Sequence, residues 1–185
     1  PAPGPLPTGE APAQGRGRVA GLHVGATLGT VRAPNRESCM FLKPSGMPYL
    51  RFLQTLHETC LFDWYLEVGC RSGKSFAPVR SKTTAVDPFF RAEINIIGKK
   101  PALHVFQQTS DDFFASGFLT RNGIRLGLAF LDGMHLFEFL LRDFMNTEKA
   151  MDPKGVILLH DCVPFNVDMT TRDLDNLPRG AWTGD

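Results

Sequence analysis

The sequence predicts an α/β fold in which a mostly parallel sheet is covered by helices on both faces. Short, mostly apolar runs that are typical of buried strands recur along the chain and alternate with stretches of helical spacing. Acidic or glycine residues stand at the C-terminal end of nearly every run, where open α/β sheets bind their ligands. The 185 residues are enough for one domain with a sizeable core.

Composition and charge narrow the possible partners. The net charge of +1 gives no electrostatic reason to expect nucleic acid or an anionic membrane as a partner. No apolar run approaches the ~18 residues of a membrane span. The four cysteines contain no C-x-x-C pair, which indicates reduced thiols and a cytoplasmic location. The sequence gives no indication of the oligomeric state.

The first third of the chain divides into a tail and a helix-containing arm. Residues 1–20 are rich in proline, glycine and alanine, so they cannot bury enough apolar surface to offset the entropy of ordering, and we expect a flexible tail. Residues 21–61 are predicted to form an N-terminal arm and a helix over Tyr49–Cys60, which could cap the site. The domain itself is expected over residues 62–185.

The most informative stretch is a strand that runs into a glycine-rich turn. Residues 64–68 are predicted to form a buried strand, and Gly69 and Gly73 follow it. A turn of this kind lets the backbone approach a nucleotide-like ligand. Gly73, Lys74 and Ser75 resemble the second half of a phosphate-binding P-loop, but the spacing to Gly69 is one residue too short. No G-x-G-x-x-G dinucleotide pattern is present. The remaining pattern is an acidic strand residue, Glu67, followed by G-x-x-x-G.

The elements that follow are predicted from periodicity and turn signals. Ser110 or Asp111 is expected to cap a helix, and Glu138 and Arg142 are expected to pair on the outer face of another. The apolar residues 136, 137, 140, 141 and 144 should form the inner face of that second helix. We expect helices over Ser72–Val79 and Leu136–Met145, strands over Thr83–Val86, Leu103–Phe106, Leu126–Leu131 and Val156–Leu159, and a turn over 152–155.

Asp87 stands at the end of the strand that follows the glycine-rich turn. A carboxylate in that position can accept hydrogen bonds from ribose hydroxyls. An aspartate before a proline, here Pro88, is also a common turn former. After the Glu67, Gly69 and Gly73 pattern, ribose binding is the favoured interpretation.

Three motifs together resemble one enzyme family. They are DWYLEVGCRSGKSF, AFLDGMHLFEFLLRDF and GVILLHDCVPFN, which lie between about Tyr65 and Pro164. This set is similar to the small-molecule O-methyltransferase branch of the class I S-adenosylmethionine-dependent methyltransferases, including macrocin O-methyltransferase and cephalosporin-hydroxylase-type domains. In that branch one strand ends in D-G-x-H and a later strand ends in H-D. The resemblance implies a Rossmann-like fold that closes with an antiparallel hairpin. Residues 165–185 are too short and too polar for the hairpin, so we expect the domain to lack its C-terminal strands.

The resemblance also implies roles for individual residues. Asp132 would contact the cofactor. It would also be catalytic together with His135, which would act as the base. Asp132 and Asp161 match positions that bind a divalent cation such as Mg²⁺, although the neighbouring His160 and Cys162 do not supply the expected additional oxygen ligand. The expected S-adenosylmethionine contacts are Glu67, Gly69, Cys70, Gly73 and Ser75 for methionine, Asp87 for ribose, and Ser110 and Asp111 for adenine.

The implied activity is methylation of a hydroxyl group on a small-molecule or sugar-like acceptor. Two alternatives remain open at this point. One is a non-catalytic relative that binds the cofactor and acts as an interaction module. The other is a P-loop nucleotide-binding enzyme that depends on Lys74. His135 and His160 could also have a purely structural role.

Overall fold

The computed structural model describes residues 45–179 and 181–185. The predicted tail and most of the predicted arm lie outside these residues. The described part contains a five-stranded sheet in the order β3-β2-β1-β4-β5, and every neighbouring pair of strands is parallel. The strands are β1 (Trp64–Val68), β2 (Lys82–Val86), β3 (Leu103–Phe106), β4 (Leu126–Leu131) and β5 (Met151–Leu159). This confirms the predicted α/β, Rossmann-like fold.

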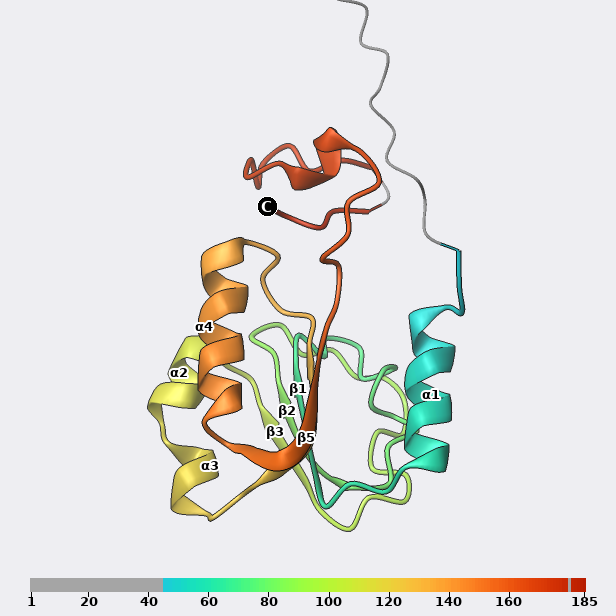
Figure 1. The fold of residues 1–185 in the computed structure, drawn as a ribbon, viewed down its shortest axis with the longest axis vertical. Helices are drawn as coiled ribbons and strands as arrows, with labels where there is room; N and C mark the ends of the chain where they lie inside the picture. Colours follow the sequence, from blue (N-terminus) through green and yellow to red (C-terminus); the bar gives the residue numbers. More distant parts are fainter. Residues whose placement is uncertain (1–44, 180) are drawn as a thin grey trace, which may run out of the picture. The chain divides into compact units, whose positions relative to one another are not determined.

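Helices lie on both faces of the sheet (Figure 1). Helix α1 (Tyr49–Thr59) covers one face, and it matches the predicted helix to within one residue. The opposite face carries α2 (Ser110–Ala115), α3 (Phe118–Arg121) and α4 (Phe137–Glu148). A short 3-10 helix, η1 (Val167–Thr170), follows β5.

The core has one apolar layer on each face of the sheet because side chains alternate along the strands. In β1, Tyr65 packs with Leu53 of α1, while Leu66 belongs to the layer under α2 and α4. Both side chains are fully buried. The central strands therefore hold their carboxyl ends in fixed positions, and the loops that follow these ends build the site.

The structure corrects two predictions at element boundaries. Residues 71–78 form successive turns rather than the predicted helix, because Gly73 adopts φ +75°, which an α-helix does not allow. The expected turn over 152–155 lies inside β5, which starts at Met151. There the pairing with β4 is irregular: Leu126 pairs with Met151, whereas Leu128 pairs with Val156.

Two further corrections concern helices α2 and α4. Thr109, not Ser110 or Asp111, caps α2 by accepting a hydrogen bond from the Asp112 N–H.

The inner face of α4 includes the buried polar side chains Asp143 and Thr147, while Phe137 and Leu141 are exposed. The predicted pair within α4 does not form, because Arg142 binds Asp111 and Glu138 binds Arg172.

The described residues after β5 contain no further strand, as the polar composition of this region predicts. No helix in the described part of the chain has both the length and the apolar character needed to cross a bilayer.

Candidate functional site

A cavity of about 1030 Å³ lies at the carboxyl ends of the strands. Its walls come from the loops after β1, β2, β4 and β5, from the start of α2 and from the first turn of α1. Nine of the predicted site residues line it, and these are Gly69, Cys70, Ser75, Asp87, Ser110, Asp111, Asp132, His135 and Asp161. Glu67 and Gly73 were also predicted as cofactor contacts, but they are not among the lining residues.

Gly69 is required where the loops after β1 and β4 touch. Its φ of +85° is unfavourable for any residue with a side chain. A Cβ atom at this position would lie 1.9 Å from the carbonyl oxygen of Asp132. The Gly69 N–H also donates to the Val86 carbonyl of β2 at 2.9 Å. One residue thus joins the ends of three neighbouring strands.

Glu67 stabilises the glycine-rich loop from within the core. Its carboxylate is fully buried and accepts hydrogen bonds from the Tyr65 hydroxyl, at 2.6 Å, and from the Ser75 hydroxyl. Burial raises the pKa of this carboxyl from 4.5 to about 7, although the two hydrogen bonds oppose the rise. In this structure Glu67 holds Ser75 in the cavity wall and does not itself reach the cavity.

Asp87 has the turn-forming role that the sequence suggested, and it also faces the cavity. Its Oδ2 accepts the backbone N–H of Arg71 at 2.6 Å, and its Oδ1 accepts the N–H of Phe89 at 2.7 Å. The carboxylate therefore fastens the turn after β1 to the turn after β2. It also lines the cavity, and each carboxylate oxygen has a second lone pair available for a ligand.

Asp111 is engaged by a neighbouring helix. Both of its carboxylate oxygens accept from Arg142 of α4, at 3.0 Å and 2.9 Å. These bonds hold the start of α2 against α4. Asp111 keeps its place in the cavity wall, but its charge is already paired.

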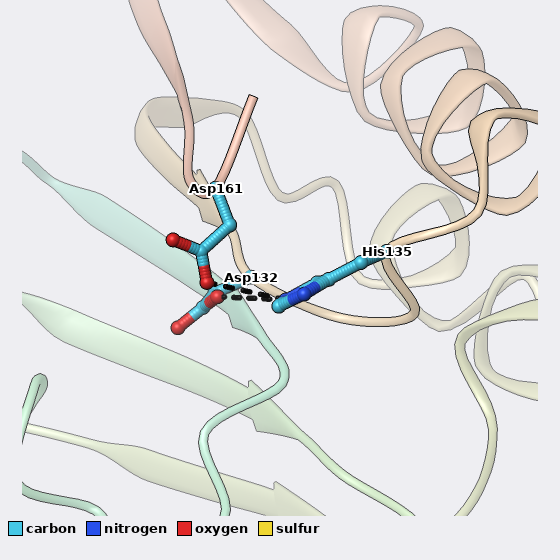
Figure 2. A group of neighbouring side chains, drawn as sticks. All are labelled: Asp132, His135 and Asp161. Atoms are coloured by element: carbon cyan, nitrogen blue, oxygen red, sulfur yellow. Dashed lines mark hydrogen bonds and ion pairs between the residues drawn. The ribbon is translucent and has the colours of Figure 1, made fainter. Parts of the chain in front are cut away.

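Two aspartates and two histidines meet at the ends of β4 and β5. His135 Nε2 lies 3.4 Å from Asp132 Oδ1 and 3.7 Å from Asp161 Oδ2 (Figure 2). His160 Nδ1 lies 3.0 Å and 3.4 Å from the same two oxygen atoms. Asp161 has a φ of +49°, an uncommon backbone conformation for aspartate at the end of β5. We refer to Asp132, His135, His160 and Asp161 as the Asp–His cluster.

Hydrogen bonds within the Asp–His cluster shift the pKa values of its two histidines upwards and the pKa of Asp132 downwards. Hydrogen bonds to Asp132 and Asp161 raise the pKa of His160 to about 10. The hydrogen bond to Asp132 also raises the pKa of His135, although burial opposes it. Burial would raise the pKa of Asp132, but the hydrogen bonds from the two histidines hold it below its ordinary value.

The same cluster contains a candidate metal site. Ligand atoms of Asp132, His135 and Asp161, one from each residue, lie within 4.8 Å of one another (Figure 2). The two aspartates that the resemblance implies as metal ligands are therefore brought together, and His135 joins them. Cys162 is not part of the group, because its thiol points to the backbone carbonyl of His160 at 3.1 Å.

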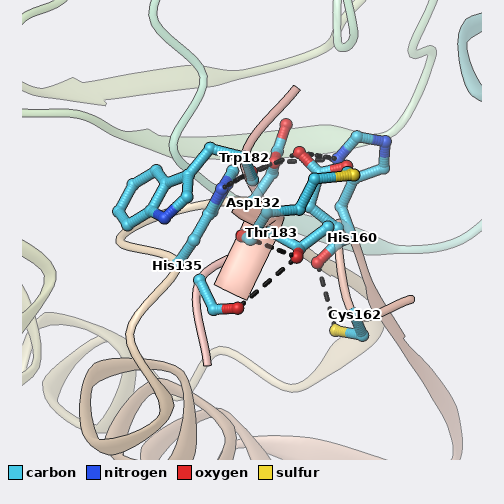
Figure 3. Close-up of polar contacts among 9 residues, drawn as sticks. Asp132, His135, His160, Cys162, Trp182 and Thr183 are labelled. Atoms are coloured by element: carbon cyan, nitrogen blue, oxygen red, sulfur yellow. Dashed lines mark hydrogen bonds and ion pairs between the residues drawn. The ribbon is translucent and has the colours of Figure 1, made fainter. Parts of the chain in front are cut away.

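Two residues at the site were missed by the sequence analysis. The Tyr49 ring packs on the His160 ring with their centroids 4.2 Å apart, and it lines the cavity. The only signal in the sequence was its position in the first turn of the predicted helix α1. The backbone carbonyl of Trp182 accepts from His135 Nδ1 at 2.8 Å (Figure 3). A backbone contact of this kind leaves no signature in residue types.

Comparison with known proteins identifies the family. The sequence profile of the methyltransferase domain matches residues 66–162, just over half of the chain. This stretch runs from β1 to the residue after Asp161, so it includes the glycine-rich turn and the whole Asp–His cluster. No curated protein and no solved structure matches the chain significantly. The chain belongs to the methyltransferase domain family.

Proposed function

We propose that the protein transfers a methyl group from S-adenosylmethionine to a hydroxyl group of a small-molecule or sugar-like acceptor. The observation that carries this proposal is the shared cavity, which is lined both by residues of the glycine-rich turn and by the Asp–His cluster. Membership of the methyltransferase family supports methyl transfer and the use of S-adenosylmethionine in general. The hydroxyl acceptor and the roles of the residues are inferred from the chemistry of the cavity.

The cofactor would occupy the side of the cavity formed by the turns after β1 and β2. Gly69 leaves the backbone there uncovered, and Asp87 offers lone pairs to ribose hydroxyls. Ser110, at the start of α2, borders the adenine end. Ligand pockets commonly measure ~300–1,000 Å³. A cavity of about 1030 Å³ therefore fits the cofactor together with a small acceptor.

The acceptor would lie beside the Asp–His cluster, under Tyr49. When bound, S-adenosylmethionine supplies an activated methyl group on a sulfonium, so the protein mainly has to align the acceptor oxygen with that carbon. In this role His135 would take up the proton of the acceptor hydroxyl as methyl transfer proceeds. Asp132 and Asp161 flank Nε2 and stabilise the imidazolium that results.

The same atoms offer, as an alternative, a binding site for a divalent cation. Two carboxylate oxygens and one imidazole nitrogen suit a cation of the manganese, iron or zinc type better than magnesium. A bound cation would lower the pKa of a coordinated hydroxyl. However, His160 already places a positive charge next to Asp132 and Asp161. We therefore favour His135 as the base, with His160 in place of a metal ion.

A substitution at His135 tests the proposed base. We expect His135→Ala to lower kcat with the best acceptor by about 10²–10⁴-fold, the usual contribution of general base catalysis. The dissociation constant for S-adenosylhomocysteine should remain unchanged. His104→Ala is a matched control, because His104 lies on β3 and is not among the residues that line the cavity. Full turnover in His135→Ala would remove the residue from the mechanism.

Removal of metal ions by a chelator distinguishes general base catalysis by the Asp–His cluster from cation binding by the same cluster. Turnover with tritiated cofactor would be measured before and after dialysis against EDTA. Unchanged turnover is expected if His160 supplies the positive charge. Loss of turnover that returns on addition of Mn²⁺ would show that the cluster holds a cation.

Two alternatives make different predictions. A non-catalytic relative would bind S-adenosylhomocysteine but would methylate no acceptor in a broad panel. A P-loop enzyme would bind ATP with magnesium and would lose that affinity in Lys74→Ala. The P-loop requires a helix directly after the loop, whereas residues 71–78 form turns.

A further inference from the structure

Helix α1 forms part of the wall of the cavity. Tyr49 and Leu50, in its first turn, line the cavity. The Tyr49 ring packs on the His160 ring of the Asp–His cluster with the centroids 4.2 Å apart. A movement of α1 away from the sheet would therefore open the cavity beside this cluster.

Apolar packing alone holds α1 in place. Within the described residues, no hydrogen bond or ion pair joins α1 to the sheet or to another helix. Its side-chain hydrogen bonds are local: Gln54 donates to Glu58 at 2.9 Å, and Thr59 donates to the carbonyl of Thr55 at 2.8 Å. The attraction to the sheet comes from side chains such as Leu53, which is fully buried in the apolar layer under α1.

The helix has little stability of its own. It is 11 residues long, Pro48 at its N-cap provides no side-chain hydrogen bond, and its first turn contains no acidic residue. Helices shorter than about 12–15 residues are only marginally stable in water without packing. Detachment of α1 from the sheet should therefore also unwind it and expose its backbone N–H groups to solvent.

His57 is the polar side chain in the interface between α1 and the sheet. It is 1% exposed, and neither ring nitrogen has a hydrogen-bond partner in the described part of the chain. The ring stands edge-on against Phe62 and Tyr65, with centroids 6.3 Å and 4.7 Å away. The Tyr65 hydroxyl does not serve His57, because it donates to Glu67. Burial of an unpaired polar group costs free energy, so His57 opposes the docking that Leu53 favours.

Acid weakens the docking of α1 further. Burial and the charge of Lys100 lower the pKa of His57 from 6.5 to about 4. A detached helix exposes the ring to water, where its pKa is ordinary, so the docked form binds fewer protons and docking weakens as the pH falls below 6.5. Between pH 7.5 and 5.5 the ratio of detached to docked helix should rise about tenfold. Lys100 and Tyr65 are the titratable groups that face the ring.

We propose that α1 is a lid, which detaches locally from the sheet to open the cavity beside the Asp–His cluster, and that the buried His57 keeps its docking weak. Apolar contacts close the lid, and the unpaired imidazole makes it easy to open. The lid motion is a property of the ligand-free chain. Its effect on the release of the cofactor product rests on the proposed methyltransferase function.

Two substitutions separate the polarity of His57 from its charge. His57→Leu places an apolar side chain of similar size in the interface, so docking should become stronger and lose its dependence on pH. His57→Gln keeps an uncharged polar group there, so docking should stay weak and lose only the pH dependence. His104→Leu is a matched control, because His104 packs against the rings of Trp64 and Phe118 and not under α1.

Hydrogen exchange followed by mass spectrometry measures the detachment in the ligand-free chain. Protection factors, which are corrected for the intrinsic exchange rate, are compared between residues 53–59 and β4 at pH 7.5 and 5.5. In the unsubstituted protein and in His104→Leu, we expect α1 to be at least tenfold less protected than β4, with a further loss of about tenfold at pH 5.5. Glu67 titrates in the same range, but it is present in every variant, so its effect cancels in the comparison.

The His57 variants give the decisive results. His57→Leu should raise the protection of α1 at least tenfold at pH 7.5 and remove its pH dependence. His57→Gln should stay within about threefold of the unsubstituted value at pH 7.5, also without pH dependence. Equal protection of α1 and β4 in the unsubstituted protein would overturn the lid. Unchanged protection of α1 in His57→Leu would overturn the role of His57.

Release of tritiated S-adenosylhomocysteine into an excess of unlabelled ligand tests what the lid controls. We expect release to be at least fivefold slower from His57→Leu than from the unsubstituted protein or from His104→Leu. Stronger protection of α1 with an unchanged release rate would refute the lid as the gate of the cavity. A folded chain that binds no S-adenosylhomocysteine would refute the proposed function, whereas the exchange experiment would still decide whether α1 detaches.

Discussion

Glu67→Gln gives the sharpest quantitative prediction from the structure. Burial raises the pKa of the Glu67 carboxyl from 4.5 to about 7 in the folded protein. Between these two pH values the folded chain keeps a proton that the unfolded chain releases, so stability falls as the pH rises. The contribution is fully present below pH 4.5 and is lost as the pH passes 7. At about 1.4 kcal/mol for each pKa unit, the whole loss amounts to about 3 kcal/mol.

The assay is urea unfolding, followed by tryptophan fluorescence, at a series of pH values from 4.5 to 8. Glutamine has nearly the shape of glutamate and does not ionise, so the comparison at each pH isolates the carboxyl from all other titrating groups. We expect the difference in unfolding free energy, unsubstituted protein minus Glu67→Gln, to fall by about 3 kcal/mol across this range. Glu93→Gln, at an exposed position, should reproduce the pH profile of the unsubstituted protein.

Parallel profiles for the unsubstituted protein and Glu67→Gln would refute the raised pKa of Glu67. That outcome would mean that Tyr65, Ser75 and the nearby positive charge of Lys100 stabilise the carboxylate as well as water does. A difference that grows with pH would contradict it more strongly, because it would reverse the sign of the shift.

Gly69 in the glycine-rich turn and Tyr65 in β1 offer two further tests. Gly69→Ala adds a Cβ 1.9 Å from the Asp132 carbonyl oxygen at a φ of +85°. Backbone strain of about 1–2 kcal/mol and overpacking of about 1–3 kcal/mol should together lower the free energy of unfolding by about 2–5 kcal/mol. Gly117→Ala, at a φ of +65° with nothing within 4 Å, should cost only the strain, and equal losses in the two variants would contradict the role of Gly69. Tyr65→Phe removes the donor to the buried Glu67 and should cost about 1–3 kcal/mol in urea unfolding, whereas a cost below about 0.5 kcal/mol would mean that Glu67 does not need it.

The strands could be predicted because their signals are local. β3 and β4 have the predicted bounds, since each is a short apolar run that ends in polar or glycine residues. β5 starts five residues earlier than expected, because Asp152 and Pro153 have the composition of a turn. Only the neighbouring strand β4 shows that the chain continues in the sheet there. The turns over 71–78 depend on the positive φ of Gly73, which the residue type allows but does not impose.

The site was predictable where the topology brings residues together. Asp132 and Asp161 follow two strands that are parallel neighbours, so their side chains had to meet at one edge of the sheet. The supporting role of Glu67 could not be predicted from the motif, because its burial and its hydrogen bonds to Tyr65 and Ser75 depend on packing around the strand. The contacts of Tyr49 with His160 and of Trp182 with His135 join distant parts of the chain, and one of them uses a backbone atom.

Calorimetric titration tests the central claim most directly. The protein would be titrated with S-adenosylhomocysteine and, separately, with ATP and magnesium. The structure and the family predict micromolar binding of S-adenosylhomocysteine, weakened by substitutions of Asp87, and no heat from ATP. Binding of ATP that Lys74→Ala abolishes, or no binding of S-adenosylhomocysteine by the folded protein, would contradict the proposal that this cavity holds the methyl donor.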